Sequence, residues 1–153
     1  MKFEITSVFF ATLCILGLGF AGLPLSPALA AGDSAGTLTI NIAGFRNDAG
    51  FAMISVVNSQ KGYDDGIHYR KFKCRIAGGR VTQLVVDLEF GEYGISIYHD
   101  ENENGKIDKR MFGIPVESYG FSNNARGRFG PPGYEEVKFM FNAPAMVISV
   151  DVQ

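Results

Sequence analysis

Polar and apolar side chains alternate along residues 37–42, Thr37-Leu-Thr-Ile-Asn-Ile42. Successive side chains of a β-strand point to opposite faces, so this period of two predicts a strand that buries one face. Six further segments alternate in the same way or form short apolar runs: residues 51–57, 69–76, 81–88, 93–99, 137–141 and 146–152. Glycine, proline and asparagine separate them, as in turns between strands. We therefore predict an all-β fold, a seven-stranded antiparallel β-sandwich.

The buried faces of these segments predict the hydrophobic core. Its expected members lie on one side of each strand: Ile40, Ile54, Phe72, Val86, Ile95, Ile97, Val137, Phe139 and Ile148. Cys74 alternates with Phe72 and Ile76 and is expected to be buried with them. No segment keeps a helical period, and a short helical turn near residues 60–67 is the most that we predict.

The first 30 residues have the composition of an export signal. An apolar run from Val8 to Phe20 precedes two prolines and the sequence Ala28-Leu-Ala30, after which cleavage is expected. The run is short for a membrane span, and a retained N-terminal anchor is the alternative. We predict a signal peptide over residues 1–30, one β-sandwich domain over residues 31–153, and a periplasmic or secreted protein with no membrane span after cleavage.

Charge and cysteine content narrow the possible partners. The sequence has 14 Lys and Arg against 16 Asp and Glu, a net charge of −2, which gives no basic excess for nucleic acid or an anionic membrane. The predicted signal carries one charge of each sign, Lys2 and Glu4, so its loss leaves this balance unchanged. Cys74 would then be the one remaining cysteine, which excludes a disulfide within the chain.

Oxygen-bearing side chains stand at alternate positions after the segment at residues 93–99. In Asp100-Glu-Asn-Glu-Asn-Gly-Lys-Ile-Asp108 they occupy positions one, three, five and nine, with glycine at six. This spacing is typical of loops that wrap around Ca²⁺, in which position six needs a positive φ and position seven offers its carbonyl. Ligands that are all oxygen favour calcium over zinc. The predicted metal ligands are Asp100, Asn102, Asn104, the carbonyl of Lys106, and Asp108.

Two observations limit this prediction. Position twelve is Met111 rather than a bidentate glutamate, so the expected Ca²⁺ site is weak or is completed from elsewhere. A run of Asp, Asn and Gly after a strand is also typical of an ordinary solvated turn, which is the alternative. The apolar Ile107 at position eight, where calcium loops place a residue that packs inward, favours the ion.

Residues 109–133 have no strand or helix period. Loops of this length in a small domain are usually functional or disordered, and the aromatic residues, glycines and prolines of this one favour a fixed path. Arginines beside aromatic rings bind carboxylates, phosphates or sugars. The predicted ligand-binding residues are Glu117, Tyr119, Asn123, Asn124, Arg126 and Arg128. The alternative is structural, in which the two arginines neutralise Glu117, Glu135 or Glu136 and fix the loop.

Two phrases in this half of the chain resemble a known bacterial family. They are His99-Asp-Glu-Asn102 and Gly120-Phe-Ser-Asn-Asn-Ala-Arg126. They are similar to DUF2141, a family of domains of unknown function, and the similarity runs over most of residues 31–153 and is densest over residues 88–139. The resemblance implies a small exported protein with a sandwich fold and no assigned activity. The phrase Leu88-x-x-Gly91-x-Tyr93 also resembles transthyretin-like sandwiches, and seven short strands are typical of immunoglobulin-like ones, so either type is expected.

Three functions from different classes remain open. We expect an exported noncatalytic module, in which Ca²⁺ orders residues 100–108 and these hold a binding loop at residues 109–133 for a small molecule, a glycan or an envelope protein. The second is an enzyme using His99 with Asp100 or Glu117 as acid and base. Against it, no nucleophile motif is present, two histidines cannot form a three-histidine metal site, and His99 is equally placed to end the buried face of its strand. The third is a structural or assembly role in the envelope through an exposed sheet edge.

Overall fold

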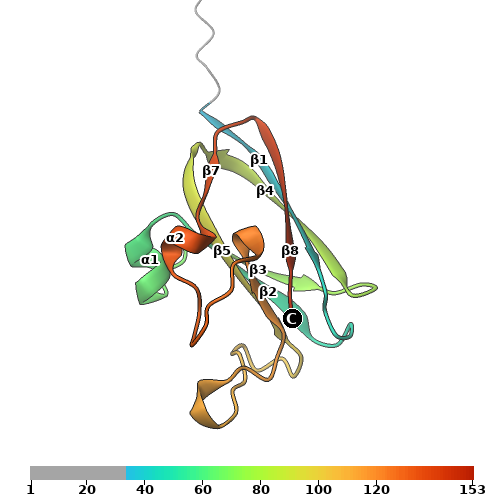
Figure 1. Ribbon diagram of the computed structural model, residues 1–153. Helices are drawn as coiled ribbons and strands as arrows, with labels where there is room; N and C mark the ends of the chain where they lie inside the picture. Colours follow the sequence, from blue (N-terminus) through green and yellow to red (C-terminus); the bar gives the residue numbers. More distant parts are fainter. Residues whose placement is uncertain (1–33) are drawn as a thin grey trace, which may run out of the picture. The chain divides into compact units, whose positions relative to one another are not determined.

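A computed structural model describes residues 34–153 (Figure 1), so the predicted signal peptide and its boundary at residue 30 lie outside the described residues. The strands are β1 (Ala35–Ala43), β2 (Phe51–Val57), β3 (Arg70–Arg75), β4 (Arg80–Glu89), β5 (Gly91–Asp100), β6 (Tyr119–Phe121), β7 (Phe139–Phe141) and β8 (Ala145–Asp151). The helices are α1 (Gln60–Asp65) and α2 (Tyr134–Val137), with 3-10 turns η1 (Met111–Gly113) and η2 (Ser122–Asn124). None of the helices in this part of the chain is long and apolar enough to cross a bilayer.

The strands form two sheets, which confirms an all-β, sandwich-like fold. One sheet has the order β4-β1-β8, and the other has the order β3-β2-β5-β6, with β7 also paired to β5. Each of the seven predicted segments contains a strand, and α1 lies within the predicted helical turn. β6 is an eighth strand, inside the segment that was expected to have none. Three residues are too few to show a period of two.

One strand pair contradicts the predicted antiparallel arrangement. β1 and β8 pair in parallel, from Thr37 opposite Ala145 to Ala43 opposite Asp151. The turn after β7 carries the chain from the five-stranded sheet to the start of β1, where the N–H of Thr37 donates to the carbonyl of Pro144 at 2.9 Å. β8 therefore begins beside the beginning of β1 and must run in the same direction.

The sandwich core fills the space between the two sheets. Ile40, Ile54, Ile95 and Ile97 are buried there, as predicted. The other members predicted for these strands, Phe72, Phe139 and Ile148, are half-buried and pack against the core, as does Cys74. The Cys74 thiol donates to Oε1 of Gln83 at 3.0 Å, and burial raises its pKa.

Val86 was predicted in the core and is 53% exposed. Val81 and Val85 point inward, but the β1–β4 register shifts by one residue, so that Leu38 lies opposite Val85 and Gly36 lies opposite Leu88. Val86 follows the inward Val85 and therefore points outward by alternation. The extra residue is a β-bulge, with Asp87 at φ +49, and it brings Leu88 rather than Asp87 to the core. Arg70 of β3 donates to the carbonyls of Val86 and Asp87 at 2.6 and 2.9 Å.

A second, smaller core covers the outer face of the five-stranded sheet. It consists of Val57, Phe121, Tyr134 and Val137, with Tyr63, Tyr119 and Ala125 packed against them. Val137 is buried as predicted, but in α2 rather than in a strand. Figure 1 shows α1 and α2 side by side, and the rings of Tyr63 and Tyr134 lie 5.9 Å apart between them. A Cβ on Gly94 would lie 3.1 Å from Val137 and 3.2 Å from Tyr134, so α2 packs directly on the backbone of β5.

β6 and β7 pair with different parts of β5. Ser96 lies opposite Phe121, and Tyr93 lies opposite Phe139. Continuing the first register would place Asn124 opposite Tyr93, so 15 residues are inserted between the two pairings. Ser122 lies at the break, where its hydroxyl accepts the N–H of Ile95 at 2.9 Å and donates to the carbonyl of Val137. A side chain thus replaces the strand bonds that the insertion removes.

Candidate functional site

β5 ends at the predicted metal loop. Tyr93, Ile95, Ile97 and His99 are buried on the face that points into the sandwich, and Asp100, the last residue of the strand, is also fully buried. The connection from β1 to β2 passes very close to this end. A Cβ on Gly50, whose φ is +63, would lie 1.9 Å from the Asp100 carbonyl, so only glycine permits this approach.

The carboxylate of Asp100 organises the first half of the loop. Oδ1 accepts the N–H of Asn104, and Oδ2 accepts the N–H of Gly105, both at 2.9 Å. Position one therefore binds the backbone of positions five and six, which forces the chain to curl. Gly105 has φ +76, which confirms the positive φ predicted at position six. Tyr98 closes the same turn by donating its hydroxyl to the Gly105 carbonyl at 2.9 Å.

The other predicted side-chain ligands meet at Asp108. The amide of Asn102 donates to Oδ2 of Asp108 at 2.6 Å, and the amide of Asn104 donates to Oδ1 at 3.0 Å. The N–H of Lys106 donates to Oδ1 of Asn104 at 2.8 Å. The fold thus brings these side chains together in a closed hydrogen-bond network. Each acceptor oxygen keeps a second lone pair that could face a cation.

The predicted ligand set contains few acidic groups. Within residues 34–153, no cluster of three or more His, Cys, Asp or Glu side chains is arranged to hold a metal ion. The predicted site has two carboxylates, Asp100 and Asp108, and depends on amide and carbonyl oxygens for the rest. Burial, followed by the charges of Asp100 and Glu117, raises the pKa of the adjacent Tyr98. Negative charge is therefore concentrated around this turn.

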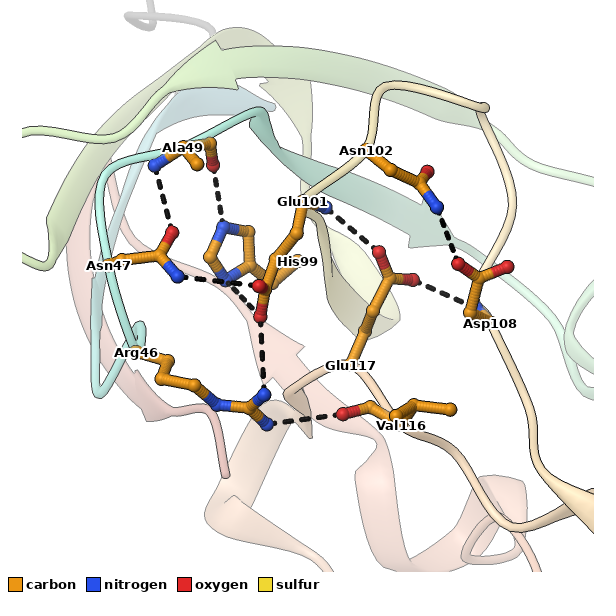
Figure 2. Close-up of polar contacts among 9 residues, drawn as sticks. All are labelled: Arg46, Asn47, Ala49, His99, Glu101, Asn102, Asp108, Val116 and Glu117. Atoms are coloured by element: carbon orange, nitrogen blue, oxygen red, sulfur yellow. Dashed lines mark hydrogen bonds and ion pairs between the residues drawn. The ribbon is translucent and has the colours of Figure 1, made fainter.

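Glu117 joins the two ends of the loop (Figure 2). Its side chain is almost fully buried, with Oε1 accepting the N–H of Glu101 at 2.9 Å and Oε2 accepting the N–H of Asp108 at 2.8 Å. The sequence predicted a ligand-binding role for this residue. The structure places its carboxylate on the backbone of residues 101 and 108, so residues 100–108 and the segment that follows are fixed to each other.

The side chain of Glu101 contacts a second group of polar residues, which the sequence did not predict (Figure 2). Oε1 lies 3.6 Å from the guanidinium of Arg46, and Oε2 accepts the amide of Asn47 at 3.3 Å. Arg46 also donates to the carbonyl of Val116 at 3.1 Å, next to Glu117. The contacting residues are 54 and 70 positions apart in the sequence. No local spacing pattern could have predicted these contacts.

His99 ends the buried face of β5, as one of the alternatives predicted. Its ring is fully buried and packs in a T-shaped arrangement with the ring of Phe45, with the two ring centroids 5.4 Å apart. Nε2 is 2.7 Å from the carbonyl of Ala49 and donates to it. Nδ1 lies 3.7 Å from Oε1 of Glu101 and has no hydrogen-bond partner among the described residues. The ring is therefore held on one side and faces a carboxylate on the other.

Three predicted ligand-binding residues contact the backbone of their own domain. The amide of Asn123 donates to the carbonyls of Glu136 and Lys138, and Oδ1 of Asn124 accepts the N–H of Asp151 at 2.8 Å. Arg126 donates to the carbonyls of Tyr119 and Asp151 at 3.2 and 2.9 Å. These side chains fix the turn after β6 to the ends of α2 and β8.

The other two, Tyr119 and Arg128, line a groove of about 600 Å³. Its walls come from residues 107–115 and 127–131, and its floor comes from β5 and β6. A second hollow of about 460 Å³, lined by α1 and residues 131–133, shares Ser96, Phe121 and Pro131 with it. The predicted alternative, in which Arg126 and Arg128 pair with acids, is not seen: within residues 34–153 neither forms an ion pair.

Comparison with known proteins identifies one family. The family described as "uncharacterized protein conserved in bacteria" (DUF2141) matches residues 40–149, which confirms the resemblance seen in the sequence. No curated protein and no solved structure matches the chain. The match includes strands of both sheets, residues 100–108 and the groove.

Proposed function

The chain belongs to the DUF2141 family of uncharacterised bacterial proteins, and from this premise we propose that it is an exported, noncatalytic binding module. In this proposal residues 100–108 hold one Ca²⁺, and the ion stabilises the segment at residues 109–133, which binds the ligand. The observation that carries the proposal is the position of Glu117. Its carboxylate accepts one N–H from each end of the metal loop and itself belongs to the segment that leads to the groove.

The contacts within the loop support a cation of low affinity. Two carboxylates, two amides and the carbonyl of Lys106 supply oxygen only, which suits Ca²⁺. Asn102 and Asn104 already solvate Asp108 through their NH₂ groups, so an ion would have to replace these bonds. With Met111 where a bidentate glutamate would stand, we expect a dissociation constant of about 10⁻⁴–10⁻³ M.

A noncatalytic role is supported by the contacts of the residues that an acid–base mechanism would use. His99 is fully buried and donates from Nε2 to a backbone carbonyl. Both oxygens of Asp100 and both oxygens of Glu117 accept backbone N–H groups. A general base must reach a proton on the substrate, and these groups are engaged within the fold instead.

Edge pairing in an envelope assembly has less support than ligand binding. β4 is one edge of the three-stranded sheet, and a strand added there would need its free carbonyls. Arg70 occupies the carbonyls of Val86 and Asp87 at the bulge. The bulge and the guanidinium are both devices that discourage pairing at an edge.

Export and the finer fold type belong to the same proposal. Export is supported by the apolar run and the small-residue site at residues 8–30, and intact-mass measurement of the exported protein should give a chain that begins at Ala31. Retention of Met1 would contradict it. An immunoglobulin-like or transthyretin-like topology is supported by two sheets packed around one core, and an experimental structure would test which type applies.

The proposal is tested by titrating the protein with calcium, with binding measured by calorimetry and stability measured by thermal unfolding. Ca²⁺ at about ten times its dissociation constant should stabilise the protein by roughly 1.4 kcal/mol through mass action. Asn102→Ala and Asp100→Ala should each abolish this increment. Lys106→Ala is the matched control and should keep it, because the site uses only the carbonyl of that residue.

The increment, rather than the absolute melting temperature, is the quantity to compare. Asp100→Ala also removes two hydrogen bonds to the loop backbone and lowers stability with or without the ion. Asn102→Ala also removes the hydrogen bonds of its amide with Asp108 and with the N–H of Asn104, but this side chain is exposed, so the stability without the ion should fall less than in Asp100→Ala. If the melting temperature of the unmutated protein responds to neither calcium nor chelator, the loop is an ordinary solvated turn and the proposed Ca²⁺ site is wrong.

A further inference from the structure

The groove combines apolar walls with cationic side chains. Aromatic rings from Tyr98, Tyr119, Phe121 and Phe129 line it, together with Lys109 and Arg128. No aspartate or glutamate is among its lining residues. A cavity of about 600 Å³ is within the range of small-molecule sites, which are lined mainly by apolar side chains and orient the ligand through a few polar groups.

The two cations are free to meet a ligand. Within residues 34–153, neither Lys109 nor Arg128 takes part in an ion pair, whereas Arg46, Lys61, Arg75 and Lys138 do. The guanidinium of Arg128 presents a planar fork of donors that matches a carboxylate. Positive charge without an internal partner, at the rim of an acid-free groove, is complementary to an anion.

Exposed apolar side chains indicate the nature of the ligand body. Phe129 is 103% exposed and Ile114 is 61% exposed, although both line the groove. The backbone near both walls is fixed: the N–H of Arg110 donates to the carbonyl of Ile114 at 2.8 Å, and Tyr63 donates its hydroxyl to the carbonyl of Pro132 at 2.8 Å, just beyond the second wall. Aromatic side chains pair best with other rings, offset or edge to face.

We propose that this groove binds a small organic acid with a planar aromatic body and one carboxylate. The body lies between Tyr119 and Phe129, and the carboxylate faces Arg128, with Lys109 on the other wall. This inference rests on the proposed binding module and deepens it by giving the ligand class. It does not require an ion in the loop at residues 100–108.

Titration calorimetry with 2-naphthoate and its neutral counterpart 2-naphthalenemethanol tests the proposal on the purified protein. The acid should bind more tightly than the alcohol by about tenfold, which is the discrimination of one charge-assisted hydrogen bond. Arg128→Gln should remove this preference and leave the binding of the alcohol unchanged. Phe129→Ala should weaken both probes.

Arg110→Gln is the matched control. It removes one positive charge from the neighbour of Lys109 in sequence, but Arg110 does not line the groove, so the preference for the acid should persist. Equal affinity for the two probes, equal effects of Arg128→Gln and Arg110→Gln, or no binding of naphthoate at millimolar concentration would overturn the proposal. Tighter binding of decanoate than of naphthoate would contradict the proposal that the body of the ligand is aromatic.

The same titrations in calcium and in chelator separate this inference from the proposed function. If calcium stabilises the protein but naphthoate does not bind, the proposed ligand class is wrong and the proposal of a calcium-dependent module stands. The other result is that naphthoate binds equally well in chelator, to a protein whose melting temperature does not change with calcium. That result would support ligand binding in the groove and contradict the Ca²⁺ site of the proposed function.

Discussion

Two long connections flank β6, and they are ordered by different physics. Residues 101–118 lead from β5 to β6, and residues 122–138 lead from β6 to β7. Each closes at its base on one buried polar side chain: Glu117 in the first connection and Ser122 in the second. The first base is a carboxylate surrounded by backbone N–H groups, whereas the second is an uncharged hydroxyl next to packed aromatic and aliphatic side chains.

The rest of each connection is held by the same kind of interaction as its base. The first is held by side-chain oxygens on backbone N–H groups, and Met111 and Ile114 point into solvent. The second buries Tyr134 and Val137 against the outer face of the sheet. Hydrogen bonds to charged groups depend on protonation and on ions, while apolar packing does not. We therefore expect the first connection to respond to solution conditions and the second to respond mainly to changes of side-chain volume.

Val137→Ala should have the largest effect, because it removes two methyl groups from the packed connection. Val137 is fully buried between Gly94 and Tyr134, so a cavity remains, and large-to-small core changes of this kind cost about 2–3 kcal/mol. Urea unfolding monitored by tyrosine fluorescence measures the loss. Val147→Ala is the matched control, since that side chain is 64% exposed and should change stability by less than about 0.5 kcal/mol. A loss at Val137 no larger than at Val147 would show that packing does not order this connection.

Glu117→Gln should cost about 2 kcal/mol, because a carboxylate that accepts two backbone N–H groups becomes an amide with one acceptor oxygen. Its NH₂ group would face a donor. Glu103→Gln removes a carboxylate that is half exposed and lies 3.9 Å from Arg75, and should cost far less. Limited proteolysis should find new cleavage between residues 101 and 116 in the first variant only. Equal protection in both variants would mean that Glu117 does not hold the connection.

The strands and the tight turn at residues 100–105 were predictable because their causes are local. Alternation over six to ten residues identified seven strands, and the contacts of Asp100 with Asn104 and Gly105 follow from spacing within one turn. Leu84, Val85 and Val86 are consecutive apolar residues, so the sequence alone does not say which of them face the core, and the bulge that returns Leu88 to the core inserts a single residue into a strand whose apolar pattern continues. Parallel pairing of β1 with β8 depends on where the chain crosses between sheets, which periodicity does not encode.

The long-range part of the site could not be predicted for a similar reason. Arg46 and Asn47 lie in a turn whose composition is ordinary, and they meet Glu101 only after both sheets have formed. Asn123, Asn124 and Arg126 were singled out because polar side chains in a long loop attract a functional interpretation. The structure gives their amides and guanidinium backbone partners, in a connection that has little secondary structure of its own to satisfy those groups.

Ser122→Ala should have a smaller effect, about 1–2 kcal/mol, because it leaves the buried N–H of Ile95 without an acceptor. The variant changes little volume, so it tests the hydrogen bond at the base separately from the packing at Val137. Ser149→Ala, on the exposed face of β8, is the control. Hydrogen exchange should speed up at Ile95 and at residues 134–138 while residues 101–108 keep their protection. Faster exchange in both connections would show that they are coupled rather than independent.

The smallest effect concerns two tyrosines that hold the two connections in matching ways. Tyr98 donates to the carbonyl of Gly105 in the first connection, and Tyr63 donates to the carbonyl of Pro132 in the second. Burial raises the pKa of both hydroxyls, with neighbouring carboxylates adding to it, and that of Tyr63 reaches about 12. The folded state thus favours the neutral phenol. This contribution is complete below the unfolded pKa of about 10 and is lost as the pH rises towards 12.

Tyr63→Phe should therefore lower stability by about 1 kcal/mol at neutral pH, through one neutral hydrogen bond, and flatten the loss of stability between pH 10 and 12. Tyrosinate absorbance during alkaline titration should lose the component that ionises near pH 12 in this variant, while Tyr98→Phe should remove a different component. Tyr69→Phe is the control, because Tyr69 is exposed and its replacement should leave the component near pH 12 in place. If Tyr63→Phe keeps that component, the hydroxyl is not buried in the second connection, and the packed base would be more open to solvent than the cluster around Tyr134 implies.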